Sequence, residues 1–458
     1  MEANQESRRQ FIKSTALALT GVSLGVGTTV LFTGCKDEGI QKASGTRLAL
    51  RKNIAYLPID DPEIKLLKDA FKILKKRSQI SPLDPSGWEA QSMLHATFCA
   101  TSIYANQVHY NWYVWPWHRL YLWSMEQKLQ KAVGEPTLAL HYWDWTKKNT
   151  IPEHYWGGAD NPLYNPTRLV SAQDEIPTDF INVGATLRAS NYQTFGGYPA
   201  VKSEKESQID GMAEQTFHNN IHNWVGGQMA TFIESGFDPL FYGHHGNCDR
   251  IWTAWQRYSE KNRVPADENW LEKRLYSTDG TGKPIAFTIR ELLDNKSLGY
   301  DFQDLNLNPN VCNPYTEAQK PIRIPTKADC KAAVNVSDSH DAIFKDYTDN
   351  KQQHIMLHFE RAQLPYHPYC ARVFFEFSQD NQRQSVYSGT FTILPILDLD
   401  SFLLQRGVYL QIEADPKIMQ ALNEKAQIEV VFQPVRLPNR PIPEEPLRLQ
   451  NITLKKVS

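Results

Sequence analysis

Apolar side chains recur at helical spacing through the first half of the chain. Between 64 and 76 four of them share one helical face with lysines between them, which predicts an amphipathic helix. They are Ile64, Leu67, Phe71 and Leu74. Two further long helices are predicted over 115–133 and 241–259. The stretch 151–200 is rich in Pro, Gly and Asn and predicts a long irregular excursion.

The pattern changes beyond a polar, proline-containing linker over 306–345. Short runs that alternate with period two, or are rich in β-branched residues, predict strands there. These runs are 373–377, 389–394, 408–414, 428–435 and 447–454, with a short helix at 417–423. We therefore predict a mainly α domain over 36–305 and a C-terminal all-β sandwich over 346–458.

The first 35 residues predict an export signal and are set aside from the fold. Arg8 and Arg9 form a twin-arginine pattern, and an apolar run follows over 16–32. The run ends at Cys35 in a sequence that resembles a bacterial lipoprotein cleavage box. We expect export by the twin-arginine route and a lipid anchor on Cys35 that tethers the protein to a membrane. The alternative is an uncleaved membrane anchor.

Composition narrows the possible functions. The 458 residues are 41% hydrophobic and 22% charged, which is enough to bury a sizeable core. The net charge of -2 gives no electrostatic footprint for nucleic acid. Six cysteines in so long a chain exclude a small disulfide scaffold.

Histidines carry the clearest chemical signal. Nine of the 13 lie between positions 95 and 245. His218 and His222 stand at i, i+4 on a predicted helix, so both rings project from one face. The pair His244–His245 follows, but neighbouring helical residues point about 100° apart, so at most one readily joins the same metal. Upstream, a second group is formed by His95, His109 and His118.

Two groups of three imidazoles predict a pair of metal ions. Imidazole binds zinc, copper, iron and nickel. Two-metal hydrolases mix in bridging carboxylates, and ferrous oxygenases use two His and one carboxylate, yet neither group has an Asp or Glu at ligand spacing. Nitrogen ligation without a thiolate favours copper. The residues themselves therefore predict a dicopper site.

Two segments resemble the copper motifs of polyphenol oxidases, the tyrosinases and catechol oxidases. The first combines His95, Cys99 and His109 with WPWHRLYL over 115–122. The second combines HNNIHNWVGG over 218–227 with DPLFYGHHGNCDRIW over 238–252. The likeness continues through LGYDF over 298–302 and, more loosely, into the β-rich tail.

The resemblance implies a four-helix bundle that holds two copper ions, and oxidation of o-diphenols to o-quinones by dioxygen. Hydroxylation of monophenols occurs in some relatives. Carried over by position, the ligands of the first copper are His95, His109 and His118, and those of the second are His218, His222 and His245. His244 becomes a neighbour in the pocket, or a hydrogen-bonded core residue.

The resemblance also assigns supporting residues. Cys99 matches a cysteine that forms a thioether with the second histidine of the first site, here His109; the alternative is a buried thiol. Cys312 and Cys330 are candidates for a disulfide in an oxidising compartment. The C-terminal domain matches a shield over the copper site, with candidate blocking residues near 366–369. Removing residues from about 340 onward is then expected to raise activity.

Three more residues carry expected roles by the same resemblance. Glu214 and Asn219 match positions that hold a water near the second copper, basic enough to take a phenolic proton; otherwise they are a helix-surface carboxylate and a cap. Phe232 matches an aromatic gate over the second copper, or is simple core packing. The partners are then phenolic small molecules and dioxygen. The alternatives in other classes are a haemocyanin-like dioxygen carrier and a two-zinc hydrolase.

Overall fold

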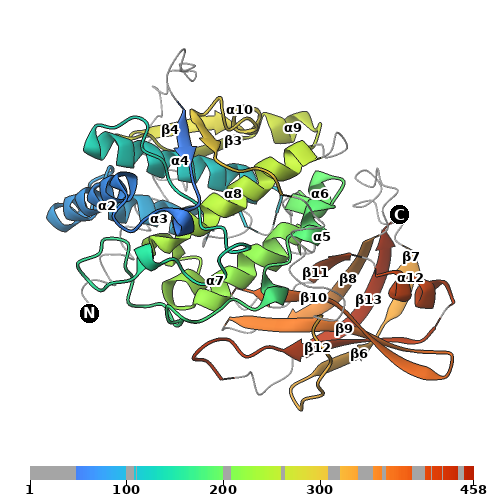
Figure 1. Ribbon diagram of the computed structural model, residues 1–458. Helices are drawn as coiled ribbons and strands as arrows, with labels where there is room; N and C mark the ends of the chain where they lie inside the picture. Colours follow the sequence, from blue (N-terminus) through green and yellow to red (C-terminus); the bar gives the residue numbers. More distant parts are fainter. Residues whose placement is uncertain are drawn as a thin grey trace, which may run out of the picture.

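The computed structural model shows a helical body followed by a body of strands (Figure 1). This confirms the predicted order of a helical domain and a C-terminal β domain. The structure describes residues 48–99, 108–109, 111–199, 208–258, 264–307, 320–338, 354–363, 368–394, 408–413, 415–424, 426–441 and 448–457. The predicted export signal over 1–35, Cys35 included, lies outside these residues.

The main helices of the body lie where the apolar pattern placed them. Each of the three predicted ranges overlaps a helix almost end to end. The longer helices are α2 (Pro62–Ile80), α3 (Trp88–Cys99), α4 (Val114–Val133), α7 (Asn219–Val225) and α8 (Leu240–Tyr258). Shorter ones are α5 (Gly184–Leu187), α6 (Tyr192–Gly196), α9 (Glu268–Leu271) and α10 (Ile289–Leu292). Within the described residues, no helix is both long and apolar enough to cross a membrane.

Helix α2 shows how local chemistry sets these elements. The Asp61 side chain accepts a hydrogen bond from the backbone N–H of Glu63, and Pro62 occupies the first turn, where its missing N–H costs nothing. The four predicted apolar residues of this helix are all buried. Helix α4 ends at Gly134, whose φ of 72° is the left-handed conformation that glycine adopts without strain.

The C-terminal body consists mainly of two sheets. One has the strand order β10-β9-β12-β6 and the other β2-β11-β8-β13-β7. The strands are β2 (Gln208–Ile209), β6 (Cys330–Ala333), β7 (Asn335–Asp338), β8 (His354–Gln363), β9 (Tyr369–Gln379), β10 (Gln382–Ile393), β11 (Val408–Glu413), β12 (Ile428–Pro434) and β13 (Arg448–Val457), with α12 (Pro416–Asn423) between β11 and β12. Val373, Phe375 and Phe377 alternate on one face of β9 and belong to the core of this body.

Strand β8 is not among the predicted runs, and two further features differ from the sequence prediction. The predicted linker over 306–345 contains β6 and β7, so pairing within the β domain begins by Cys330. Strand β2 belongs to the helical body in sequence yet pairs in parallel with β11 of the β domain. Short strands whose partners lie far along the chain leave no periodic signal in the sequence, because long-range pairing alone selects them.

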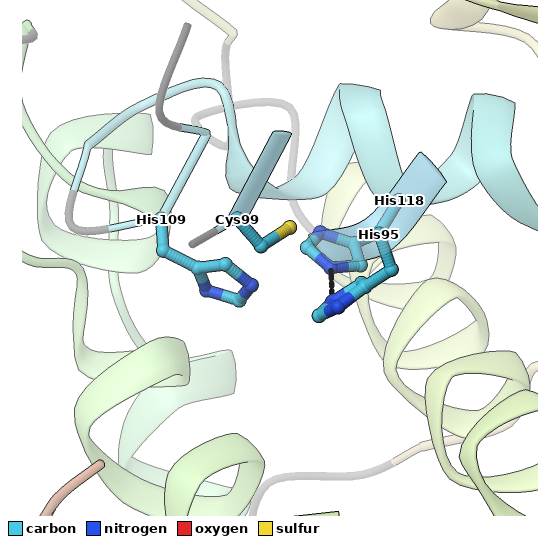
Figure 2. Close-up of side chains that lie close together, drawn as sticks. All are labelled: His95, Cys99, His109 and His118. Carbon is cyan, nitrogen blue, oxygen red and sulfur yellow. Dashed lines mark hydrogen bonds between the residues drawn. The ribbon is translucent and has the colours of Figure 1, made fainter. Parts of the chain in front are cut away.

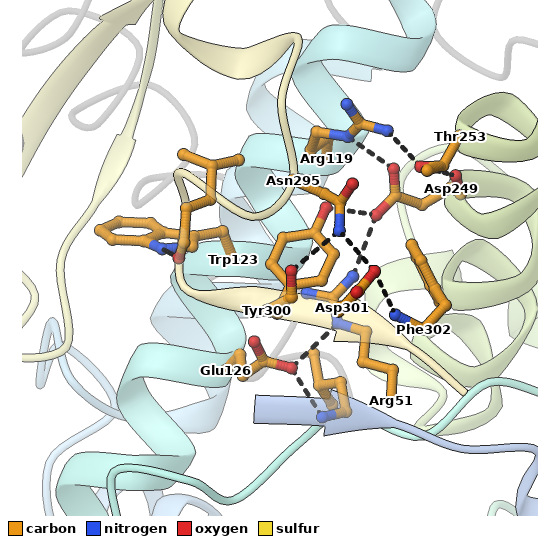
Figure 3. A network of polar contacts seen from close by, with 12 residues as sticks. Arg51, Arg119, Trp123, Glu126, Asp249, Thr253, Asn295, Tyr300, Asp301 and Phe302 are labelled. Atoms are coloured by element: carbon orange, nitrogen blue, oxygen red, sulfur yellow. Dashed lines mark hydrogen bonds and ion pairs between the residues drawn. The ribbon is translucent and has the colours of Figure 1, made fainter. Parts of the chain in front are cut away.

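A buried ionic network ties the N-terminal strand β1 (Ala49–Arg51) to helices α4 and α8 (Figure 3). Asp249 accepts hydrogen bonds from Arg51 at 3.0 Å, Arg119 at 2.7 Å and the Tyr300 hydroxyl at 2.6 Å. Arg51 also pairs with Glu126 at 3.0 Å. The ion pair between Arg119 and Asp249 thus joins α4 to α8 at the centre of a larger set.

Replacing Asp249 by Asn is expected to destabilise the fold strongly. The two arginines are buried and would lose the carboxylate that they share. Removing one partner of a buried ion pair typically costs about 3–5 kcal/mol. Urea unfolding monitored by circular dichroism measures this change. Glu268→Gln, which removes an exposed partner of Arg290, is the control and should leave the midpoint unchanged.

Candidate metal centre

The first histidine group is assembled from two helices and the loop between them. His95 comes from α3, His118 from α4, and His109 from the intervening segment (Figure 2). Cys99, the last residue of α3, joins them, and the four ligand-type atoms lie within 4.8 Å of one another. All four residues are buried.

The second group comes from η4 (Glu214–His218), α7 and α8. His218 ends η4, His222 lies in α7, and His245 lies in α8. The Nε2 atom of His245 lies 3.3 Å from Nε2 of His218 and 3.0 Å from Nε2 of His222. In the first group, Nε2 of His118 lies 3.4 Å from Nε2 of His95.

The opposite ring nitrogens, Nδ1, have hydrogen-bond partners in five of the six histidines. The Nδ1 atoms of three rings face backbone carbonyl oxygens, which can only accept a hydrogen bond, so these nitrogens carry the proton. The pairs are His95 with Phe232 at 2.9 Å, His118 with Val114 at 2.7 Å and His222 with Met229 at 2.7 Å. Two more Nδ1 atoms face side-chain oxygens: His109 faces Glu214 at 2.7 Å, and His218 faces Asn219 at 2.8 Å.

The arrangement fits metal ions. With the proton on Nδ1, the Nε2 atoms of His95 and His118 both present lone pairs, and lone pairs that face each other at 3.4 Å repel unless a cation lies between them. The Nδ1 atom of His245 has no hydrogen-bond partner among the described residues, and its Nε2 atom lies 3.0 Å from that of His222. Burial lowers the pKa of His109 and of His222 to about 3, so both rings are neutral. Neutral imidazole is the form that binds a metal. The nitrogen-rich donor set fits a pair of copper ions.

The two groups meet in one buried space. The ring of His118 stacks on that of His245 with centroids 4.4 Å apart, and the rings of His109 and His218 lie 5.4 Å apart. Each contact joins one histidine of the first group to one of the second. Two ions held by these groups would therefore be close neighbours.

The segment η4 is a π-helix, a rare turn that often marks functional sites. Its middle residue, Thr216, departs from helical dihedrals with φ -99° and ψ -108°. The irregular turn lies between Glu214 and His218, and Glu214 contacts the first histidine group while His218 belongs to the second.

Glu214 and Asn219 touch histidines of different groups. Both are buried, and both accept a hydrogen bond from an Nδ1 atom, of His109 and His218 respectively. A carboxylate or amide behind a metal-bound imidazole orients the ring, and a carboxylate also raises its basicity. The predicted role of these residues in holding a basic water stays a prediction.

Phe232 lies against the first group. Its ring stands 4.4 Å from the ring of His109, and its carbonyl oxygen accepts the hydrogen bond from His95. The predicted role of this ring as a gate over the second copper stays a prediction, and the rings of the two groups meet in one space.

His244 and Cys99 keep the surroundings expected of them. The Nδ1 atom of His244 accepts a hydrogen bond from the Trp145 indole at 3.3 Å. His244 is thus a hydrogen-bonded neighbour of the ligand set. Burial raises the pKa of the Cys99 thiol, and the nearby Glu214 carboxylate adds to this effect. The thioether to His109 stays a prediction.

Some of the other residues with predicted roles lie outside the residues that the structure describes. Cys312 of the predicted Cys312–Cys330 disulfide lies there, as do Tyr366 and His367 of the predicted shield. Tyr369 is described: it is buried in the core of the β domain against Phe391. Its ring therefore does not enter the metal centre.

Sequence reasoning missed the backbone acceptors that orient the rings. The carbonyl of Val114 lies four residues before His118 in one helix, so ordinary helix geometry would have indicated it. The carbonyls of Met229 and Phe232 come from irregular turns between α7 and α8, which carry no periodic signal.

A comparison with known families now identifies the helical body. Two overlapping stretches, residues 85–194 and 158–258, match the common central domain of tyrosinase. This segment is similar to a tyrosinase central domain. The predicted resemblance to polyphenol oxidases is thereby confirmed, and both histidine groups lie inside the matched residues.

Plant enzymes are among the relatives by sequence. The apple (Malus domestica) polyphenol oxidase is 25% identical over 311 residues, covering 60% of this chain and 51% of that protein. The (+)-larreatricin hydroxylase of Larrea tridentata is 28% identical over 313 residues, covering 59% of this chain and 52% of that protein. The chain thus spans about half the length of these two relatives.

Solved structures share the fold across both domains. A latent aurone synthase aligns with a TM-score of 0.69 at 20% identity, covering 92% of each chain. A latent apple tyrosinase aligns with a TM-score of 0.68 at 19% identity, covering 90% of this chain and 98% of that one. The C-terminal β domain is therefore part of the shared architecture.

Replacing Glu214 by Ala is expected to weaken copper binding at the first group by about 10- to 100-fold, the usual effect of losing a residue that orients a metal-bound histidine. Glu214→Gln keeps an acceptor for the Nδ1 proton of His109 and should lose less. Copper titration against a competing chelator measures both affinities. Glu272→Ala, at an exposed carboxylate, is the control. Equal affinities in all four proteins would contradict the assigned contact.

Proposed function

We propose that this chain is a copper-dependent oxidase of phenols that converts o-diphenols to o-quinones with dioxygen. One observation carries the proposal: two groups of three buried imidazoles meet in one space, with Nε2 atoms of neighbouring rings 3.0–3.4 Å apart within each group. The tyrosinase domain match and the names of the plant relatives support this chemistry.

Each copper would be held by three of these imidazoles: His95, His109 and His118 for the first, and His218, His222 and His245 for the second. When bound, the copper pair supplies dioxygen binding and accepts electrons from the phenol. Each diphenol loses two electrons and two protons, so two diphenols reduce one dioxygen to two waters. The chain's own task is to orient the rings through their Nδ1 partners and to exclude bulk water.

Phe232 is the residue best placed to contact the substrate ring. Its side chain is buried beside His109 and offers an aromatic face within the centre. Aromatic rings favour offset or tilted packing, which orients a flat phenol. The protein would thus hold the substrate by ring contact, while Glu214 or Asn219 is the candidate for helping to remove the phenolic proton.

Oxygen uptake with catechol tests the proposal. Copper-loaded protein should consume one dioxygen for every two catechols, and the metal-free protein should consume none. Product analysis with tyrosine and tyramine alongside catechol then shows whether monophenols are also hydroxylated. The control is His222→Ala, which removes one ligand of the second group.

Other outcomes would favour other functions. Reversible dioxygen binding without catechol oxidation would indicate a haemocyanin-like carrier. A preference for two zinc ions, with no copper uptake, would indicate a hydrolase and contradict the proposed oxidase.

We also propose that the protein is exported by the twin-arginine route and tethered to a membrane through lipid on Cys35. The support is the sequence of residues 1–35. Cys35→Ala should move the exported protein from the membrane fraction to the soluble fraction, because a lipid anchor alone would hold it there. Replacing Arg8 and Arg9 by Lys should stop export itself. Membrane retention of the Cys35→Ala variant would instead favour an uncleaved anchor.

A further inference from the structure

The β domain is bonded to the second histidine group by a specific route. Among the described residues, the hydrogen bonds that join this domain to the histidine-bearing elements end on the segment 208–225. That segment includes β2, η4 and α7, and it carries His218 and His222. Figure 1 shows α7 beside β10 at the boundary between the two bodies.

Asn220 makes the central contact. Its side chain is fully buried. Its carbonyl oxygen accepts a hydrogen bond from the Thr392 hydroxyl at 2.5 Å, and its amide nitrogen donates to the Thr390 carbonyl at 3.3 Å. Both threonines lie on β10. A side chain that bonds through both ends of its amide fixes the orientation of its helix against the strand.

Asn223 extends the same contact by one turn. Its amide donates to the carbonyl of Ile393 at 3.1 Å, and Arg440 donates to its backbone carbonyl. Asn220 and Asn223 stand at i, i+3 and so share one face of α7. His218 and His222, at i, i+4, share the other face. The helix thus presents imidazoles to the metal centre and amides to the β domain.

The β domain also bonds to the first residues of the segment 208–225. Strand β2 pairs with β11, and the backbone N–H of Gln411 donates to the Gln215 side chain at 2.9 Å. The Gln411 amide also donates to the carbonyl of Asp210 at 2.7 Å. The β domain is therefore bonded to the segment on both sides of the irregular turn at Thr216.

Helix α7 needs this support for a physical reason. It has seven residues, too few for an isolated helix to be stable in water. A π-helix with a non-helical residue precedes it, and Gly226 ends it with a φ of 73°. Packing and hydrogen bonds from outside the helix must therefore define where His218 and His222 lie.

We propose that Asn220 and Thr392 are positioning residues for the second copper, so that the contact between α7 and β10 acts as a scaffold for that ion and not for the first. This inference rests on the proposed dicopper centre. It adds a specific dependence: losing the contact between α7 and β10 should weaken copper binding at the second group while the first group keeps its affinity.

The experiment separates the two sites with full-length single-site backgrounds. His95→Ala with His118→Ala leaves only the second group, and His222→Ala with His245→Ala leaves only the first. Thr392→Val, which keeps the shape and removes the hydroxyl, is added to each, and copper affinity is measured by competition with a chelator. We expect a loss of about tenfold in the second-group background and no change in the first-group background.

Two matched variants complete the test. Thr392→Ser restores the hydroxyl and should restore the affinity. Thr326→Val removes a hydroxyl bonded to Asp329 elsewhere in the β domain and should change neither site. Equal losses in both backgrounds would show general destabilisation and overturn the proposal, as would no loss in either. If the unaltered chain bound no copper, the proposed function would fail instead, which is a distinguishable result.

Discussion

The structure depends on one constraint: in five of the six histidines, a hydrogen bond between Nδ1 and a fixed oxygen turns Nε2 towards the metal centre. Buried imidazoles are neutral, and an Nδ1–H that donates to a fixed oxygen leaves Nε2 as an acceptor directed inward. Carbonyls of Val114, Met229 and Phe232 and side chains of Glu214 and Asn219 provide these oxygens. The protein therefore prepares the site without the metal, and the cost of facing lone pairs is relieved when a cation enters.

The surrounding fold serves that arrangement in two ways. The network around Asp249 ties β1, α4 and α8 together, so the helices that carry His118 and His245 have one common anchor. The helix that carries His222 is short and preceded by an irregular turn, and it is bonded to the β domain instead. The second half of the centre is thus supported by the Asp249 network through α8 and by the β domain through α7. The β domain, which the sequence predicts to be a shield, also bonds to the helix that carries His222.

Much of the fold and of the histidine site could be predicted from the sequence. Helices α2, α4 and α8 follow from apolar spacing, and strands β9 to β13 from short alternating runs, because each pattern is local. The histidine spacing indicated two groups of three. Three features could not be predicted, because each joins residues that are far apart in the sequence through irregular turns. They are the contact of Phe232 with His109, the strand pairing of Gln208–Ile209 and the contact between Asn220 and Thr392.

Anomalous diffraction at the copper edge from crystals of the copper-loaded, full-length chain tests the central claim most directly. The account predicts two peaks, one among the Nε2 atoms of His95, His109 and His118 and one among those of His218, His222 and His245. The peaks should lie close enough to share one dioxygen molecule. A single peak, a peak bonded to Nδ1 atoms, or two ions held on separate sides of the helical body would contradict it.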